Sequence, residues 1–193
     1  MSKLDAQADV AAAAPQDILH FWFDEATPEQ HFGKSGAFDA AIRDRFAATH
    51  RAAAAGELDE WRGSADGRLA EIIVLDQFSR NLFRGDARAF AADGMALVLA
   101  QEAIRAGADA DAGMPAMRRA FLYMPFMHSE SRVIHVEAER LFRQPGLENN
   151  YAFELKHKAI IDRFGRYPHR NAVLGRLSSD VEEAFLRRPD SSF

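Results

Sequence analysis

The central helix of the fold is predicted by residues 68–82, which read RLAEIIVLDQFSRNL. Residues 72–75 are apolar on every side of a helix, which is typical of a helix that is buried all round. By steps of three and four residues, Asp76 and Arg80 continue the stripe that includes Leu69. We therefore expect a central helix whose apolar stripe runs into a buried Asp–Arg pair.

Helical patterns recur on both sides of this stretch, and we find no alternating β-branched runs that would predict a sheet. The chain is therefore expected to be all-α: a single-domain array of about eight antiparallel helices joined by short loops. Residues 1–14 lack the layout of a signal peptide and are expected to form a disordered tail before a domain at 15–193. The helices are predicted at 15–24, 38–55, 68–82, 87–106, from 115 to a kink or end near Pro125, 129–143, 148–164 and 179–188, with loops at 27–36 and 107–113. Ser179 and Glu182 are expected to form a capping box at the start of the last helix.

Composition narrows the classes of function. The 193 residues are 48% hydrophobic and 27% charged, the balance of a globular domain, and 15 of them are Phe. The absence of Cys excludes disulfides, thiol catalysis and Cys-ligated zinc. A net charge of −5 argues against nucleic acid and anionic membranes as partners, and no apolar run reaches transmembrane length. We expect a cytoplasmic protein that needs no cofactor.

Polar residues interrupt the apolar pattern first at residues 75–84. Asp76 and Arg80 share a face with the apolar stripe, and a buried charge is costly unless it is paired. One interpretation is an internal salt bridge that orients the helices. The other is that Arg80, Asn81 and Arg84 project from the end of the helix toward a ligand.

The second polar segment is residues 123–130, which read YMPFMHSE. Pro125 is expected to kink or end the helix, so that polar groups gather at a helix boundary. His128 is a candidate general base, with Glu130 as its orienting partner. The alternative is that Ser129 or Glu130 only caps the next helix.

The third polar segment, residues 156–176, has six cationic side chains and one acid, Asp162. Gly165 and Pro168 predict a defined turn. Guanidinium groups held on such a turn suit a carboxylate or phosphate, and His169 is a further acid–base candidate. The alternative is that these arginines bind helix C-terminal carbonyls and pair with Asp76 or Glu130.

Metal and nucleotide sites are not expected. Glu154 and His157 match one half of a di-iron signature, which needs two such helices. His128, His135 and Glu139 share one helical face at steps of seven and four residues, but solvent-facing or core histidines are the more ordinary explanation. Neither glycine-rich phosphate-binding motif occurs.

At these segments the sequence resembles the bacterial domain-of-unknown-function 924 family. The resemblance rests on residues 18–23 (ILHFWF), 75–84, 121–130 and 163–176. It implies an all-α fold similar to that of tetratricopeptide (TPR) repeats, and it implies no known activity, so no catalytic residue is carried over. The chain departs from the family pattern at His135, where we expect Gln, which leaves any role of that position in doubt.

Three functions remain open, and the sequence does not decide between an enzyme and a binding protein or give the oligomeric state. The first is a cleft that binds a small anionic molecule, either as a binding site alone or in a hydrolase or transferase. The second is a TPR-like module that binds a peptide through its carboxylate. The third is a purely structural polar network. The candidate catalytic residues are His128, Glu130 and His169, and the candidate ligand-binding residues are Asp76, Arg80, Asn81, Arg84, Arg166, Arg170, Asn171 and Arg176.

Overall fold

The central helix has the buried character that its sequence predicts. The computed structural model describes residues 12–110, 114–189 and 191, and in these ranges it contains helices and turns and no strand. Helix α4 (Ala65–Ile73) continues through a π-helical turn (Val74–Phe78) into α5 (Ser79–Leu82). Every side chain from Leu69 to Leu75 is fully buried. The all-α prediction is confirmed for the described residues.

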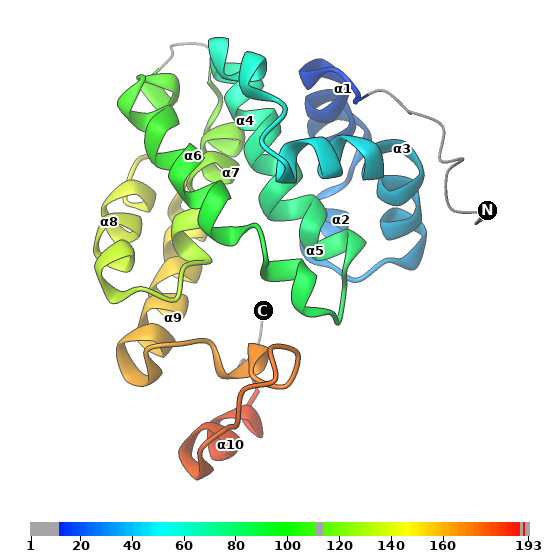
Figure 1. The fold of residues 1–193 in the computed structure, drawn as a ribbon. Helices are drawn as coiled ribbons and strands as arrows, with labels where there is room; N and C mark the ends of the chain where they lie inside the picture. The colour runs from blue at the N-terminus through cyan, green and yellow to red at the C-terminus, as the bar shows by residue number, and fades with distance from the viewer. Residues whose placement is uncertain (1–11, 111–113, 190, 192–193) are drawn as a thin grey trace, which may run out of the picture.

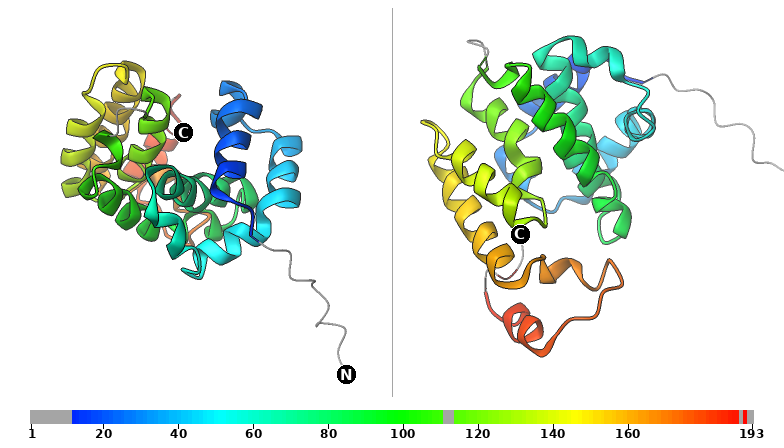
Figure 2. Two further views of the ribbon diagram at one scale, coloured as in Figure 1. Left: turned by 90° about the horizontal axis from the view of Figure 1, so that it is seen from above. Right: turned by 60° about the vertical axis from the view of Figure 1, so that its left-hand side comes forward.

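The other helices pack on two sides of this central element. Figures 1 and 2 show α1–α3 on one side of α4 and α5, and α6–α9 on the other. Helices α1, α6 and α7 contact α4, α3 contacts α5, and α8 pairs with both α7 and α9. The remaining helices are α1 (Pro15–His20), α2 (Pro28–Phe32), α3 (Gly36–Ala54), α6 (Asp93–Arg105), α7 (Ala116–Met127), α8 (Arg132–Phe142), α9 (Glu148–Phe164) and α10 (Asp180–Leu186).

An aromatic cluster fills the core between α1, α3 and the central helix. Phe21 stacks on Phe38 with ring centroids 5.3 Å apart, and Phe46 stacks on Phe78 at the same distance. Trp22 is fully buried and lies beside Phe78. Burial of one such side chain contributes about 1.5–3 kcal/mol, so this cluster is a main reason why the first three helices stay attached to the centre.

Residues 27–36 are partly helical, and the prediction of a loop there was wrong. Helix α2 starts after Thr27, whose backbone N–H donates to the Gln30 side chain at 2.8 Å. This Thr-to-Gln spacing satisfies a backbone donor that a helix start otherwise leaves free. Nε2 of His31 then donates a hydrogen bond to the Trp22 carbonyl oxygen (2.7 Å), which holds the short helix against the core.

The single long helix predicted at 87–106 is two elements. Asp86 caps a 3-10 turn (Ala87–Phe90), and α6 begins only at Asp93. Asp93-Gly94 is a turn-forming pair inside an otherwise helical pattern, and it marks the start of α6. The break places Phe90 and Asp93 next to the ends of α5 and α7.

Smaller differences occur at other helix ends. Helix α7 continues two residues past Pro125 to Met127, and α8 starts at Arg132 instead of Ser129. Ala13, assigned to the tail from sequence, donates a hydrogen bond to Thr49 (2.9 Å) and so belongs to the folded part. Residues 1–11 of the predicted tail, and residues 111–113 of the predicted loop, lie outside the described residues.

The C-terminal segment returns toward the end of α7. Helix α9 ends at Gly165, whose φ of 70° lies in the left-handed region that favours glycine. Tyr167 is fully buried after this turn, and its hydroxyl donates to the Met127 carbonyl at 2.5 Å. This anchor brings residues 168–176 beside α6 and α7. Among the described residues, no helix has both the length and the apolar character to cross a membrane.

Candidate functional site

Two of the polar segments meet at a buried Asp–His pair. His128 follows the last residue of α7, and its Nδ1 lies 2.7 Å from Oδ1 of Asp76 in the π-helical turn. Such turns are frequent at functional sites. Burial opposes ionisation of Asp76, but Arg80 and hydrogen bonds from His128 and Gln77 hold the pKa of Asp76 well below its usual range. Because Asp76 is ionised, Nδ1 of His128 carries the proton and donates a hydrogen bond to Asp76.

The remaining nitrogen of His128 is left as an acceptor. Burial, together with the nearby Arg80, lowers the pKa of His128, so the imidazole is neutral at pH 7. Its Nε2 makes no hydrogen bond with the described residues. A neutral imidazole oriented by a carboxylate is the arrangement of a general base.

Arg80 connects this pair to α6. Its Nη1 and Nη2 bind the two carboxylate oxygens of Asp93 at 2.9 and 3.1 Å, and Nη1 also lies 3.2 Å from Asp76 Oδ1. The buried Asp76–Arg80 pair expected from sequence is therefore present. Bidentate pairing with Asp93 satisfies most of the guanidinium donors of Arg80.

Arg170 lies on the other side of Asp93 and is far less well paired. Its side chain is buried (6% exposed), and its single hydrogen bond to the described residues joins Nη1 to Asp93 Oδ2 at 3.3 Å. The Nε atom is buried without a hydrogen-bond partner. Burial and the repulsion of Arg80 lower the pKa of Arg170. A buried guanidinium with unused donors is costly and favours a nearby anion.

Two aromatic rings lie against this guanidinium. The Cζ atom of Arg170 lies 4.6 Å from the ring centre of Phe90 and 4.5 Å from that of Tyr167. Rings at this distance attract the cation. The orientation of Arg170 is therefore set before any ligand arrives.

A cavity of about 340 Å³ opens beside Arg170 and His128. Its polar lining comes from the start of α6, the residues after α7 and the segment after α9. The volume lies at the lower end of the range for small-molecule sites. The polar lining residues are Asp93, His128, Ser129, Glu130 and Arg170, and the others are Ala87, Phe90, Ala91, Gly94, Leu97 and Leu174.

Glu130 lines the cavity but does not orient His128, so the pairing expected from sequence was wrong. Its carboxylate binds Arg176 at 2.6 and 2.9 Å and accepts a hydrogen bond from the backbone N–H of Tyr167 at 2.7 Å. Arg176 in turn donates to Asn171 Oδ1 at 3.0 Å. Glu130, Asn171 and Arg176 therefore hold the C-terminal segment in place, as the structural alternative predicted for Glu130.

Asn81 and Arg84 do not reach the cavity. Both bind the carboxylate of Asp39 on α3, at 2.8 Å from Asn81 and at 2.7 and 2.8 Å from Arg84. They connect the end of α5 to α3. The structure does not bring Asn81 and Arg84 to the site of His128, because both side chains donate hydrogen bonds to Asp39.

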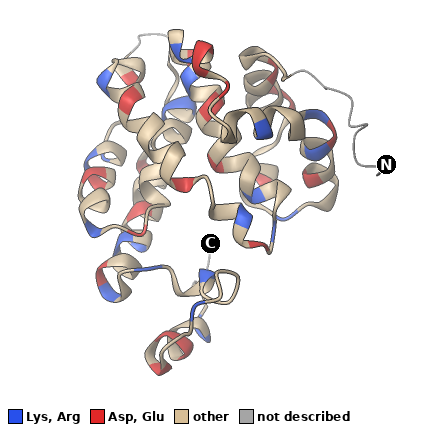
Figure 3. Cartoon of the chain, in the orientation of Figure 1, with Lys and Arg blue, Asp and Glu red and all other residues tan. Residues whose placement is uncertain are grey.

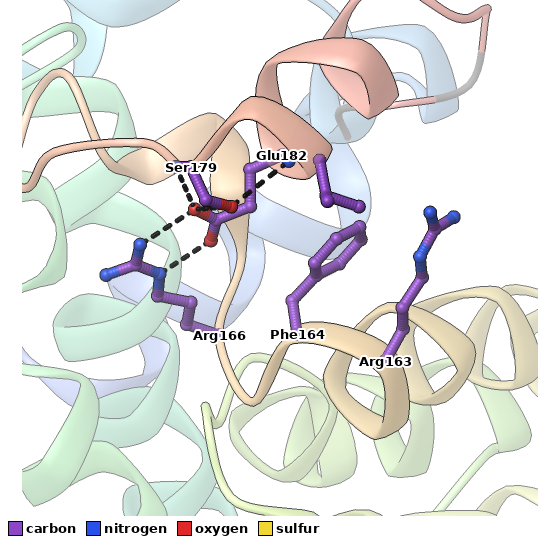
Figure 4. A pocket seen from close by; sticks show the side chains of 6 residues that line it. Arg163, Phe164, Arg166, Ser179 and Glu182 are labelled. Carbon is purple, nitrogen blue, oxygen red and sulfur yellow. Dashed lines mark hydrogen bonds and ion pairs between the residues drawn. The ribbon is translucent and has the colours of Figure 1, made fainter.

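Arg166 also lies apart from the cavity. Figure 3 shows basic residues at the end of α9 and in the segment that follows it. Of these, Arg166 turns toward α10 and binds both oxygens of Glu182 at 2.7 and 2.8 Å, while Glu182 completes the predicted capping box with Ser179 (Figure 4). This pair fastens α10 to the segment after α9.

His169 lies near Arg170 but is not among the residues that line the cavity. Its ring packs on Tyr167 with centroids 5.5 Å apart. Burial and the charge of Arg170 lower the pKa of His169 to about 4. The neutral imidazole of His169 packs against Tyr167 and helps to hold that ring in place. The histidine that faces the cavity is His128.

A second buried acid–base pair lies behind Ser129. Nδ1 of His135 is 2.7 Å from Glu154 Oε1, and Nε2 is 2.9 Å from the carbonyl oxygen of Ser129. Both side chains are fully buried. The bond from His135 to the Ser129 carbonyl oxygen positions the backbone that follows His128. Within the described ranges, no group of three His, Asp or Glu side chains has a geometry suited to a metal ion.

Three residues at the site were not singled out from sequence: Asp93, Phe90 and Tyr167. Asp93 was hidden inside a predicted helix, although its Asp-Gly pair is a turn signal that could have revealed the break. Phe90 and Tyr167 look like core residues, and only their position over Arg170 gives them another role.

The fold and the buried ionic cluster define an all-α architecture in which a small cavity lies beside His128 and Arg170. A family model described as a bacterial protein of unknown function, DUF924, matches residues 18–190, so the chain belongs to the DUF924 family. The solved structure of a protein of unknown function from Agrobacterium tumefaciens is similar, with 40% identity and a TM-score of 0.84. The match covers 90% of this chain and 96% of that one. Proteins of curated function give no match.

Proposed function

We propose that the cavity beside Arg170 and His128 binds a small organic anion. The observation that carries this proposal is the state of Arg170, a buried cation with one long hydrogen bond and an Nε without a partner. A structural ion network alone does not require such a group, because leaving donors of a buried charge unpaired costs free energy. An anion in the cavity would accept hydrogen bonds from the Nη groups of Arg170.

His128 supplies a second polar contact in the same cavity. With Nδ1 bound to Asp76, Nε2 accepts a hydrogen bond from a ligand or takes up its proton. A hydrolase or transferase would use the proton uptake by Nε2. A protein that only binds its ligand would use the hydrogen bond alone. We assign the ligand-binding role to Arg170 and the acid–base role to His128.

A peptide-binding groove of the TPR-like kind is the less favoured candidate. The cavity has the volume of a small-ligand site, and its cation is buried rather than placed along an open surface. The cytoplasmic location expected from the sequence also stays a prediction.

Calorimetric titration against a panel of metabolites tests the proposal. At least one anion should bind, and Arg170→Met should weaken its binding by about 30-fold or more, as expected when one partner of a buried charge pair is removed. Arg105→Met is the matched control. Arg105 is exposed in the last turn of α6, roughly 18 Å along the helix axis from Asp93. Equal loss in both variants, or no loss in Arg170→Met, would contradict the proposal.

A further inference from the structure

We infer that the ligand is a monocarboxylate that carries a compact apolar group. This inference rests on the proposed function and names the chemical class of the anion. It follows from three features of the cavity. These are the charges of its lining residues, the flat shape of the Arg170 guanidinium, and the apolar side chains that form the rest of its wall.

Of the arginines in and around the cavity, Arg170 has guanidinium N–H groups that are available to a ligand. Arg80 is paired with both oxygens of Asp93, and Arg176 with both oxygens of Glu130. Arg170 has one long contact with Asp93. Among the described residues that line the cavity, Arg170 is the one fixed positive charge, and a monoanion matches it in charge.

The lining also contains two carboxylates, Asp93 and Glu130. A phosphate dianion in the same 340 Å³ would lie close to both and would be repelled by them. A carboxylate carries half that charge. It also matches the flat edge of a guanidinium, because two parallel N–H groups can bind its two oxygens. The nearby rings of Phe90 and Tyr167 help to hold the guanidinium of Arg170 in place.

The remainder of the cavity wall is apolar. Phe90, Leu97 and Leu174 lie there together with three small residues. A purely polar anion would leave this surface in contact with water, whereas an apolar group on the ligand would cover it. The small volume limits that group to a compact one.

Titrations with acetate, butanoate, hexanoate, hexanamide and hexyl phosphate test the inference on the intact chain. Hexanoate should bind more tightly than acetate, by up to about fourfold for each buried methylene. It should bind about 10- to 100-fold more tightly than hexanamide, which lacks the charge. It should also bind more tightly than hexyl phosphate.

Two variants guard against loss of folding as the explanation. Arg170→Met should remove the preference for hexanoate over hexanamide. Gly94→Leu places a larger side chain at the cavity rim, where a Cβ atom meets nothing within 4 Å, and it should block all the probes while the protein stays folded. Arg105→Met should bind as the unmodified chain does.

The outcomes separate this inference from the proposed function. Tighter binding of hexyl phosphate, or hexanoate no tighter than acetate, overturns the monocarboxylate class but leaves an anion site if Arg170→Met still abolishes binding. Binding of hexanamide equal to that of hexanoate, or anion binding that ignores Arg170→Met and Gly94→Leu, overturns both.

Discussion

His128 and Asp76 are 52 positions apart in the chain, yet Nδ1 of His128 lies 2.7 Å from Oδ1 of Asp76. Asp76 lies in a π-helical turn of the central helix, and His128 directly follows the end of α7. Because α7 packs on α4, the pair lies where the two polar segments converge. It determines which nitrogen of His128 faces the cavity, and the predictions below start from it.

Asp76→Ala should lower the free energy of unfolding by about 3–5 kcal/mol, because it leaves Arg80 and His128 buried without their shared carboxylate. Urea denaturation monitored by circular dichroism measures this. Asp66→Ala is the control. Asp66 is 47% exposed in its pair with Arg118, and its loss should cost less than about 1 kcal/mol. A near-neutral effect of Asp76→Ala would mean that Asp76 is solvated.

Stability should fall as the pH drops below about 6.5, the usual pKa of an unfolded histidine. Burial lowers the pKa of His157 to about 3 and that of His169 to about 4, so the unfolded chain binds more protons than the folded chain in this window. Each such histidine contributes a slope of about 1.4 kcal/mol per pH unit. Their stabilising contribution is complete above pH 6.5 and is lost as the pH falls toward the folded pKa.

Urea midpoints measured between pH 5 and 8 check this pH dependence. His169→Gln should flatten the slope by about one proton. A stability that is constant from pH 5 to 8 would argue against neutral buried histidines in the folded state.

Hexanoate binding should be accompanied by proton uptake at His128. An anion near Nε2 raises the pKa of His128 from its lowered value in the free protein, so affinity increases as the pH falls between the free and bound pKa values. Titrations in two buffers of different ionisation enthalpy measure the uptake, which His128→Gln should abolish. Undiminished uptake in that variant would assign the proton elsewhere. The charged groups around His128 are Asp76, Arg80, Asp93, Glu130 and Arg170.

Gly94→Ala should raise the free energy of unfolding by about 0.5–1 kcal/mol. Gly94 lies in the first turn of α6, and an added Cβ meets no other atom within 4 Å, so the chain gains helix propensity without a clash. Gly67 of α4 is the opposite case. Its Cβ would lie 1.9 Å from the Trp61 carbonyl oxygen, and Gly67→Ala should cost about 1–3 kcal/mol. Thermal melts of the two variants should shift in opposite directions.

Arg84→Met should weaken folding but not ligand binding. Arg84 is 36% exposed and pairs with Asp39, so we expect a loss of about 1 kcal/mol in unfolding free energy. Hexanoate affinity should match that of the unmodified chain. If Arg84→Met lowered hexanoate affinity without lowering stability, Arg84 would be a ligand-binding residue, as predicted from the sequence.

Local sequence signals were sufficient for most of the fold. Residues 72–75 are apolar all round and are fully buried, and α9 spans the predicted Glu148–Phe164 because Gly165 ends it in a left-handed turn. The capping box at Ser179 and Glu182 was also predicted and is present. These features depend on neighbours within four residues, which the sequence displays directly.

The assignment of polar partners required the tertiary structure. The sequence shows Arg80, Arg84, Arg166 and Arg170 as equivalent cations, but their environments depend on which acid lies within about 3 Å of each after folding. Asp93, Asp39 and Glu182 neutralise the first three, and Arg170 is left with a single long contact. Coulombic energy and burial depend on distances between segments that lie far apart in the chain. The periodicity of the sequence could therefore predict a polar cluster, but not which arginine would be left with only one long contact.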